Sequence, residues 1–132
     1  MNTKVLMVTS SSFLGLAGIV ASFAPSELLR VLGSPEAAPL PVLIQLLGGA
    51  YVAFAITNWT AKDNVIGGIY SRPLSLGNSV HFLTGSLALA KQQFSQGVSL
   101  PLLVVLIVYA ALAVCFLWLV LGRGAACKVA PE

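Results

Sequence analysis

Charged side chains are scarce in this sequence. They make up 8% of the 132 residues, against 58% hydrophobic residues, whereas soluble domains carry roughly 25% charged residues. So few charges cannot build a water-exposed surface, and the mean hydropathy of +0.94 indicates lipid as the solvent. The seven Lys and Arg residues stand singly rather than in a basic cluster, so the net charge of +3 does not indicate nucleic-acid binding.

Several kinds of reactive centre are also missing from the sequence. The single histidine, His81, cannot supply two axial haem ligands, and no set of His, Cys and acidic residues has metal-binding spacing. Gly67-Gly68 lacks the lysine of a phosphate-binding loop, and Asp63 is too poorly placed to complete a Ser-His-acid arrangement. Cys115 lies in an apolar run and Cys127 in the polar tail, which argues against a structural disulfide. The sequence therefore identifies no metal site, no catalytic residue and no cofactor.

Four apolar runs of membrane-spanning length are present, at about residues 5–23, 40–59, 74–91 and 100–122. They predict an all-α, integral membrane four-helix bundle that forms a single transmembrane domain over residues 1–132. The first run has the layout of a secretory signal peptide, but Pro25 after the candidate cleavage point disfavours processing, so we interpret the run as a retained span. The third run is diluted by polar residues, and we expect it to need protein neighbours in lipid.

A short helix is predicted between the first and second spans. Pro25 suits a helix start, Glu27 its first turn, and Gly33 its end. In an interfacial helix its leucines would enter the acyl chains while Glu27 and Arg30 stay in water. The alternative is an ordinary connecting turn.

Four spans place both termini on one side of the membrane, so the basic residues can be counted by side. Two of them, Arg30 and Lys91, belong to one side, and the other five belong to the side of the termini. Because basic residues favour the cytoplasmic side, both termini are expected in the cytoplasm. The short loops suit a bacterial inner membrane. The five basic residues on the side of the termini are Lys4, Lys62, Arg72, Arg123 and Lys128.

Small residues recur every three or four positions along the predicted spans. This spacing brings them to one helix face and lets another backbone approach closely. We expect these faces to pack within the chain; the alternatives are a contact between copies or the wall of a pore. The stripes are Ser11, Gly15, Gly18 and Ser22 in the first span, Gln45, Gly49 and Ala53 in the second, Gly77, His81, Gly85 and Ala88 in the third, and Ala110 and Ala113 in the fourth.

Polar side chains within spans are costly in lipid and are candidates for function. His81 stands out because it titrates near neutral pH and lies about one helical turn from both Asn78 and Thr84. We expect a polar pocket open to the cytoplasm; the alternative is a histidine that only fixes the register of the bundle. Arg72 with Lys62 would suit a lipid phosphate or serve only as topology signals. The candidate ligand-binding residues are His81, Asn78, Asn58, Arg72, Gln45, Thr84 and Tyr109.

Two segments resemble the small four-helix bacterial membrane proteins called DoxX-like. They are Ala24-Pro25 through Leu32-Gly33 after the first span, and Leu46-Leu47-Gly48-Gly49-Ala50-Tyr51 within the second. The likeness is one of layout and covers the first three spans. The resemblance implies that some such proteins are small subunits of quinone-linked oxidoreductases. This chain shows no redox residues from which the same role could be inferred.

Three functions compete on this basis. The leading hypothesis is a non-enzymatic membrane bundle that binds a lipid, a quinone or another hydrophobic small molecule, or that serves as an accessory subunit of a larger membrane complex. The alternative is a small-solute transporter or channel, which would be a homo-oligomer because four short helices hardly enclose a path. A membrane enzyme with His81 as general base comes third, since no acid or nucleophile is positioned to assist it.

Overall fold

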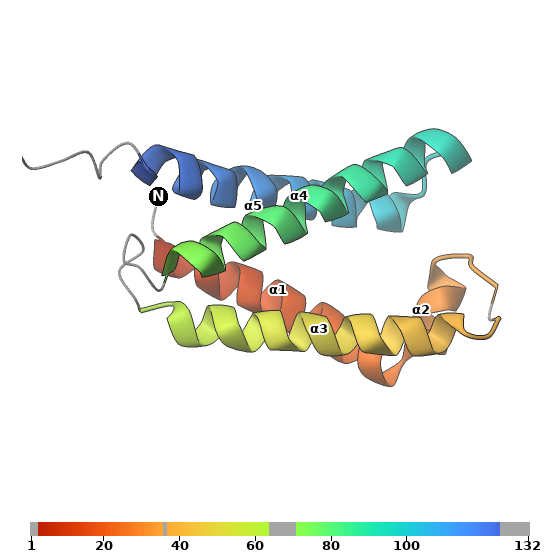
Figure 1. The fold of residues 1–132 in the computed structure, drawn as a ribbon. Helices are drawn as coiled ribbons and strands as arrows, with labels where there is room; N and C mark the ends of the chain where they lie inside the picture. The colour runs from red at the N-terminus through yellow and green to blue at the C-terminus, as the bar shows by residue number, and fades with distance from the viewer. Residues whose placement is uncertain (1–2, 36, 64–70, 125–132) are drawn as a thin grey trace, which may run out of the picture. The chain divides into compact units, whose positions relative to one another are not determined.

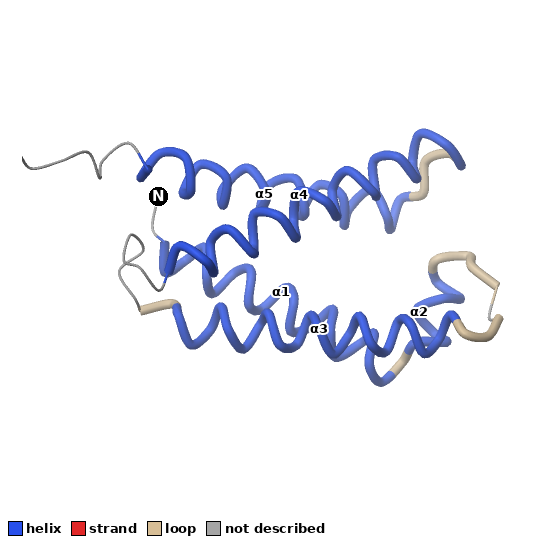
Figure 2. The backbone as a smooth tube through the Cα atoms, viewed as in Figure 1, coloured by secondary structure: helices blue, strands red, loops and turns tan. Residues whose placement is uncertain are grey.

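The computed structural model describes residues 3–35, 37–63 and 71–124, which form helices and no strand (Figures 1 and 2). The all-α prediction is therefore confirmed. Gly67-Gly68, Cys127 and Lys128 lie outside the described residues. Close contacts divide the chain into two compact units, Met1–Asp63 and Asn64–Glu132, and each is described by itself. The helices are α1 (Thr3–Phe23), α2 (Pro25–Val31), α3 (Leu40–Ala61), α4 (Ser71–Gln96) and α5 (Leu100–Gly124).

Three helices are long and apolar enough to cross a membrane, which supports a membrane protein with transmembrane helices. They are Thr3–Phe23, Leu40–Ala61 and the part Leu100–Leu121 of α5. At 1.5 Å per residue, α3 extends about 33 Å, against about 30 Å for the hydrocarbon core of a bilayer. Each of the three coincides with a span that the sequence predicts. The remaining predicted span, the third along the chain, lies in α4, whose composition is more polar.

In the first unit, α1 and α3 lie side by side and run antiparallel (Figure 1). Their backbones touch: a Cβ atom added to Gly18 would lie 2.8 Å from the carbonyl oxygen of Gly48. Nearer the start of α1, the Ser11 hydroxyl donates a hydrogen bond of 2.7 Å to the carbonyl oxygen of Ala55. Close packing of small residues and interhelical hydrogen bonds are the two means by which helices associate in lipid. The predicted packing stripe of the first span, Ser11, Gly15, Gly18 and Ser22, is confirmed.

The packing stripe predicted for the second span is wrong, because a different face of α3 contacts α1. Gln45 and Ala53 are exposed, and a Cβ atom on Gly49 would meet no atom within 4 Å. α3 instead presents Gly48 and Ala55 to α1. The physical reason is that a lipid-facing surface is as apolar as a packed one, so composition does not distinguish the two faces of this helix.

The short predicted helix is confirmed as α2, with Glu27 and Arg30 exposed and Leu29 only 2% exposed. It ends at Val31, before Gly33, which takes the left-handed conformation with φ +69°. The backbone N–H of Ser34 donates to the carbonyl of Leu29 at 3.0 Å, as in a Schellman motif. Glycine is favoured at this position because it has no Cβ atom to strain.

α4 and α5 form the second antiparallel pair, and Gln93 closes the turn between them. Its amide nitrogen donates to the carbonyl oxygen of Ser99 at 2.9 Å, and its amide oxygen accepts the N–H of Ser99 at 2.8 Å. Gly97, with φ +90°, allows the chain to reverse. The helix continues to Gln96, past Lys91, the predicted end of the third span.

α4 buries polar side chains and exposes apolar ones. The exposed apolar residues recur at intervals of three, four or seven positions, which places them on one face. A helix on the surface of a soluble protein has the opposite arrangement. Lipid is therefore the solvent that suits the exposed face of α4. The buried polar set is Ser75, Asn78, Ser79, Ser86 and Gln93, and the exposed apolar set is Leu76, Val80, Leu83, Leu87 and Phe94.

Several hydroxyl and amide groups of α4 form hydrogen bonds within the helix itself. Asn78 donates to the carbonyl oxygen of Leu74 at 2.9 Å, and the Thr84 hydroxyl donates to that of Val80 at 2.7 Å. Among the described residues, every buried side-chain nitrogen and oxygen has a hydrogen-bond partner. Because an unsatisfied polar group in lipid costs several kcal/mol, these local bonds make a polar helix compatible with the membrane interior.

Candidate functional site

His81 of α4 and Tyr109 of α5 bring an imidazole and a phenol together within the second unit. The Tyr109 hydroxyl oxygen lies 3.4 Å from Nε2 of His81, and the two ring centroids are 5.6 Å apart. In one imidazole tautomer the phenol donates to Nε2 and Nδ1 carries the proton; in the other, Nε2–H donates to the phenol oxygen. The pair can therefore both donate and accept a proton in an otherwise apolar setting.

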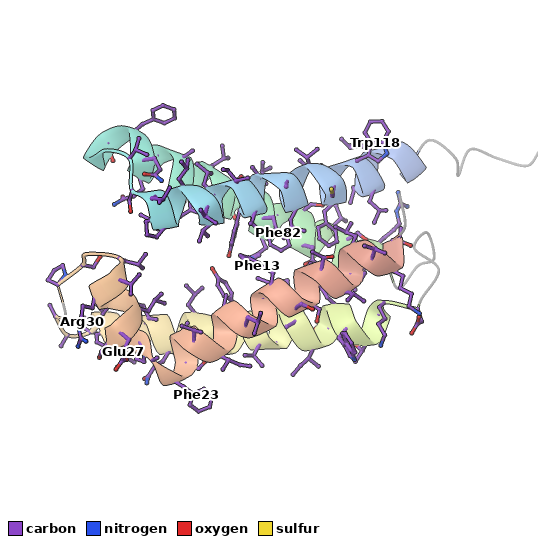
Figure 3. The ribbon with its side chains drawn as sticks, turned by 180° about the vertical axis from the view of Figure 1, so that it is seen from behind. Phe13, Phe23, Glu27, Arg30, Phe82 and Trp118 are labelled. Carbon is purple, nitrogen blue, oxygen red and sulfur yellow. The ribbon has the colours of Figure 1, made fainter. Side chains whose placement is uncertain are left out.

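A phenylalanine ring packs against both members of this pair. Phe82 is fully buried and packs edge-on against both Tyr109 and His81, at centroid distances of 5.3 Å and 5.1 Å. Behind it, Phe116 stacks on Phe82 at 5.7 Å. Phe82 is labelled in Figure 3 on α4. Tyr109 is only 4% exposed and His81 is half-buried, so His81 is the more accessible of the two polar side chains.

Gly85 makes the close approach of α4 and α5 possible. A Cβ atom at this position would overlap the ring of Tyr109 at its Cε1 and Cδ1 atoms. The ring thus occupies the space that a side chain at Gly85 would need. The sequence places Gly85 on the packing face of the third span, and this part of the prediction is confirmed, whereas Ala88 of the same stripe is exposed.

The other candidate residues of the second unit have different surroundings. Asn78 is fully buried on α4, about one helical turn before His81. Thr84 is exposed, and its hydroxyl is bound to carbonyl oxygens of its own helix. Arg72 is exposed at the start of α4. The structure thus brings His81 and Tyr109 together, with Asn78 on the buried face of the same helix.

Asn58 and Gln45 both belong to α3, in the first unit. Asn58 is fully buried, and its amide donates a hydrogen bond of 3.1 Å to the hydroxyl of Ser10 on α1. Ser10 in turn donates to the carbonyl oxygen of Met7. Gln45 is exposed, about 20 Å from Asn58 along the axis of the same helix. Asn58 therefore joins α1 and α3, whereas Gln45 faces outward near the other end of α3.

A charged cluster lies where the start of α1 meets the end of α3. The Lys4 ammonium is 2.7 Å from the Asp63 carboxylate, and that of Lys62 is 3.9 Å from the same carboxylate. Lys62 also lies over the indole of Trp59, 4.1 Å from the ring centroid. The hydrogen bond from Lys4 is the main cause that lowers the pKa of Asp63 below its ordinary value, while partial desolvation opposes the shift. The sequence predicts Lys4 and Lys62 on one side, but the pairing through Asp63 depends on the antiparallel register of α1 and α3.

A shallow apolar hollow on α5 is separate from the His81–Tyr109 pair. Trp118, which borders it, is 72% exposed and projects away from the helices (Figure 3). It follows Tyr109 by two and a half helical turns, so it points to the opposite side of α5. The hollow is lined by Val114, Leu117, Trp118 and Leu121.

Within the described part of the chain, no three His, Cys, Asp or Glu side chains lie close enough together to hold a metal ion. Comparisons of the chain with models of known families, with curated proteins and with solved structures found no match. The likeness to DoxX-like proteins therefore stays a prediction from layout.

Proposed function

We propose that this chain is a four-span membrane protein in which α4 is the additional span and both termini are cytoplasmic in a bacterial inner membrane. The support is the arrangement of α4, with its polar residues buried and its apolar residues exposed. Arg72 and Lys91, both exposed, bracket the segment 73–90, which is about 27 Å long as a helix. That length suits a bilayer core of about 30 Å with charged residues at either edge.

The proposed activity of this bundle is to bind a hydrophobic small molecule that carries a hydrogen-bond-accepting head, without transforming it. The observation that carries the proposal is the contact of His81 with Tyr109 inside an aromatic cluster. Ligand sites are mostly apolar and contain a few well-placed polar groups that fix orientation. A protein of this kind also suits the role of an accessory subunit in a larger membrane complex.

A quinone fits this chemistry best, and a lipid is the second member of the class. A quinone carbonyl accepts a hydrogen bond from an imidazole or phenol, and its planar ring packs favourably against aromatic side chains. Its isoprenoid tail is as apolar as the surrounding lipid. In the proposed contact Nδ1–H of His81 donates to the quinone carbonyl, while the Tyr109 hydroxyl donates to Nε2 and holds the imidazole in position.

The proposal is tested first by native mass spectrometry of protein released gently from its own membrane. We expect a stoichiometric adduct of a few hundred daltons or more on the wild type. Tyr109→Phe keeps the ring that packs on Gly85 and removes only the hydroxyl, so it should retain the fold and lose most of the adduct. Thr84→Ala, which removes an exposed hydroxyl on the same helix, should keep the adduct.

A titration with decylubiquinone then identifies the class of head group. The wild type and Thr84→Ala should bind it, while Tyr109→Phe and His81→Ala bind it at least tenfold more weakly without a fall in melting temperature. If His81→Ala instead lowers the melting temperature and leaves decylubiquinone binding intact, the histidine is structural and the proposal is contradicted.

An oligomeric transporter or channel is the second candidate, favoured by one observation on α3. Gln45, Gly49 and Ala53 form an exposed small-residue face, with open space beside Gly49. Such a face lets a second copy approach closely in lipid. A clean homo-oligomer without adduct in the same mass spectra, dissociated by Gly49→Leu, would favour this function over ligand binding.

A further inference from the structure

Apart from the His81–Tyr109 pair, the first unit carries a cluster that suits a different ligand. The cluster consists of Lys4, Trp59, Lys62 and Asp63, and we call it the lysine–indole cluster. Three of its side chains are well exposed, those of Lys4 and Asp63 at 59% and 62% and Trp59 at 50%, whereas that of Lys62 is 24% exposed. All four lie at the ends of apolar helices, where the headgroup layer of a bilayer would meet the protein.

The charges of the cluster do not cancel. Two ammonium groups share the single Asp63 carboxylate, at 2.7 Å and 3.9 Å, which leaves one net positive charge. At the other end of this helix pair, α2 carries one acid, Glu27, and one base, Arg30. The first unit is thus positive at the end of Lys4 and Lys62 and balanced at the end of α2, within the described residues.

The side chain of Lys62 is held in place by the groups around it. Its ammonium lies 4.1 Å from the Trp59 ring centroid and 3.4 Å from the Trp59 carbonyl oxygen. An indole at the end of an apolar helix favours the membrane interface, because its ring is apolar and its N–H is polar. These contacts fix one ammonium beside an indole ring at the end of α3.

We propose that the lysine–indole cluster binds the phosphate of an anionic phospholipid, such as phosphatidylglycerol, in the cytoplasmic leaflet. The two lysine ammonium groups bind the phosphate oxygens, and Asp63 holds the ammonium groups together while reducing their charge. A lysine near a membrane surface strengthens attraction to anionic lipid by about fivefold in affinity. The choice of leaflet rests on the proposed topology, whereas the site itself shares no residue with the His81–Tyr109 pair, so failure of ligand binding at that pair leaves this proposal standing.

The test reads the fluorescence of Trp59 in nanodiscs. Trp118→Phe makes Trp59 the only tryptophan of the chain, and the quenchers are brominated phosphatidylglycerol and brominated phosphatidylcholine at equal mole fraction. We expect stronger quenching by phosphatidylglycerol. The preference for phosphatidylglycerol over phosphatidylcholine should fall about fivefold in Lys4→Gln and in Lys62→Gln. It should rise by a similar factor in Asp63→Asn, which removes the competing negative charge.

Lys91→Gln is the matched control, since it removes an exposed lysine from a different helix, α4. It should leave the preference unchanged. Equal loss in Lys91→Gln and Lys4→Gln would overturn the proposal, because the attraction would then reflect net charge alone. Inorganic phosphate at constant ionic strength should not displace the lipid; if it abolishes the preference at millimolar concentration, the site takes free phosphate and the lipid assignment is wrong.

Discussion

Gly48→Ala is expected to destabilise the α1–α3 pair by about 1–3 kcal/mol, the usual cost of overpacking. The added Cβ atom would lie 2.7 Å from the backbone nitrogen of Ser22 and 2.8 Å from the carbonyl oxygen of Gly18. Both are backbone atoms, so the contact is relieved only by moving the helices apart. The separation would also lengthen the hydrogen bond from Ser11 to Ala55. The melting temperature in detergent micelles, followed by tryptophan fluorescence, measures the effect.

Gly49→Ala is the matched control, one position along the same helix. A Cβ atom there meets nothing within 4 Å, and replacing a helix glycine by alanine favours the helix by up to about 1 kcal/mol. The melting temperature should therefore stay the same or rise slightly. If the two alanine variants melt alike, α1 and α3 do not approach through Gly48 and the described register is incorrect.

Gly85→Ala is expected to produce a loss of similar size in the second unit and to disturb the candidate site. The added methyl group would overlap the Tyr109 ring, so the ring must rotate or the helices must separate. Either movement would carry the phenol oxygen away from Nε2 of His81, which now lies at 3.4 Å. We expect a destabilisation of about 1–3 kcal/mol together with loss of the bound molecule.

A double substitution identifies the cause of that loss. Tyr109→Ala alone leaves a cavity and should be destabilising by several kcal/mol. Combined with Gly85→Ala, the overlap with the ring is removed, so the double variant should be more stable than the sum of the two single effects predicts. Strict additivity of the two effects would show that Gly85 and Tyr109 are not in contact.

The sequence predicts much of the helical layout but only part of the packing. Apolar runs locate α1, α3 and α5, and Gly33 marks the turn after α2, because length and glycine conformation are local properties. In α1 the serines and glycines fall on a single face, so the predicted stripe coincides with the observed contact. In α3 the adjacent Gly48 and Gly49 offer two possible faces, and an apolar environment on both sides gives no signal to choose between them.

The candidate site shows the same division between local and tertiary information. His81 and Tyr109 are recognisable as polar residues within apolar runs, whereas their pairing depends on the register of α4 against α5. The Lys4–Asp63 ion pair and the closure of the α4–α5 turn by Gln93 likewise join residues that no local pattern connects. The buried and exposed faces of α4 become distinguishable only once α4 and α5 are packed together.

The central claim is that α4 crosses the membrane, because the proposed ligand site and the four-span topology both depend on it. The most direct measurement places single cysteines at either end of α4, as Arg72→Cys and Val98→Cys, in a chain whose own cysteines are replaced by serine. An impermeant maleimide should label the Val98→Cys variant in intact spheroplasts and the Arg72→Cys variant only after the membrane is opened. Labelling of both variants from the same side would show that α4 does not span the bilayer and would contradict the account.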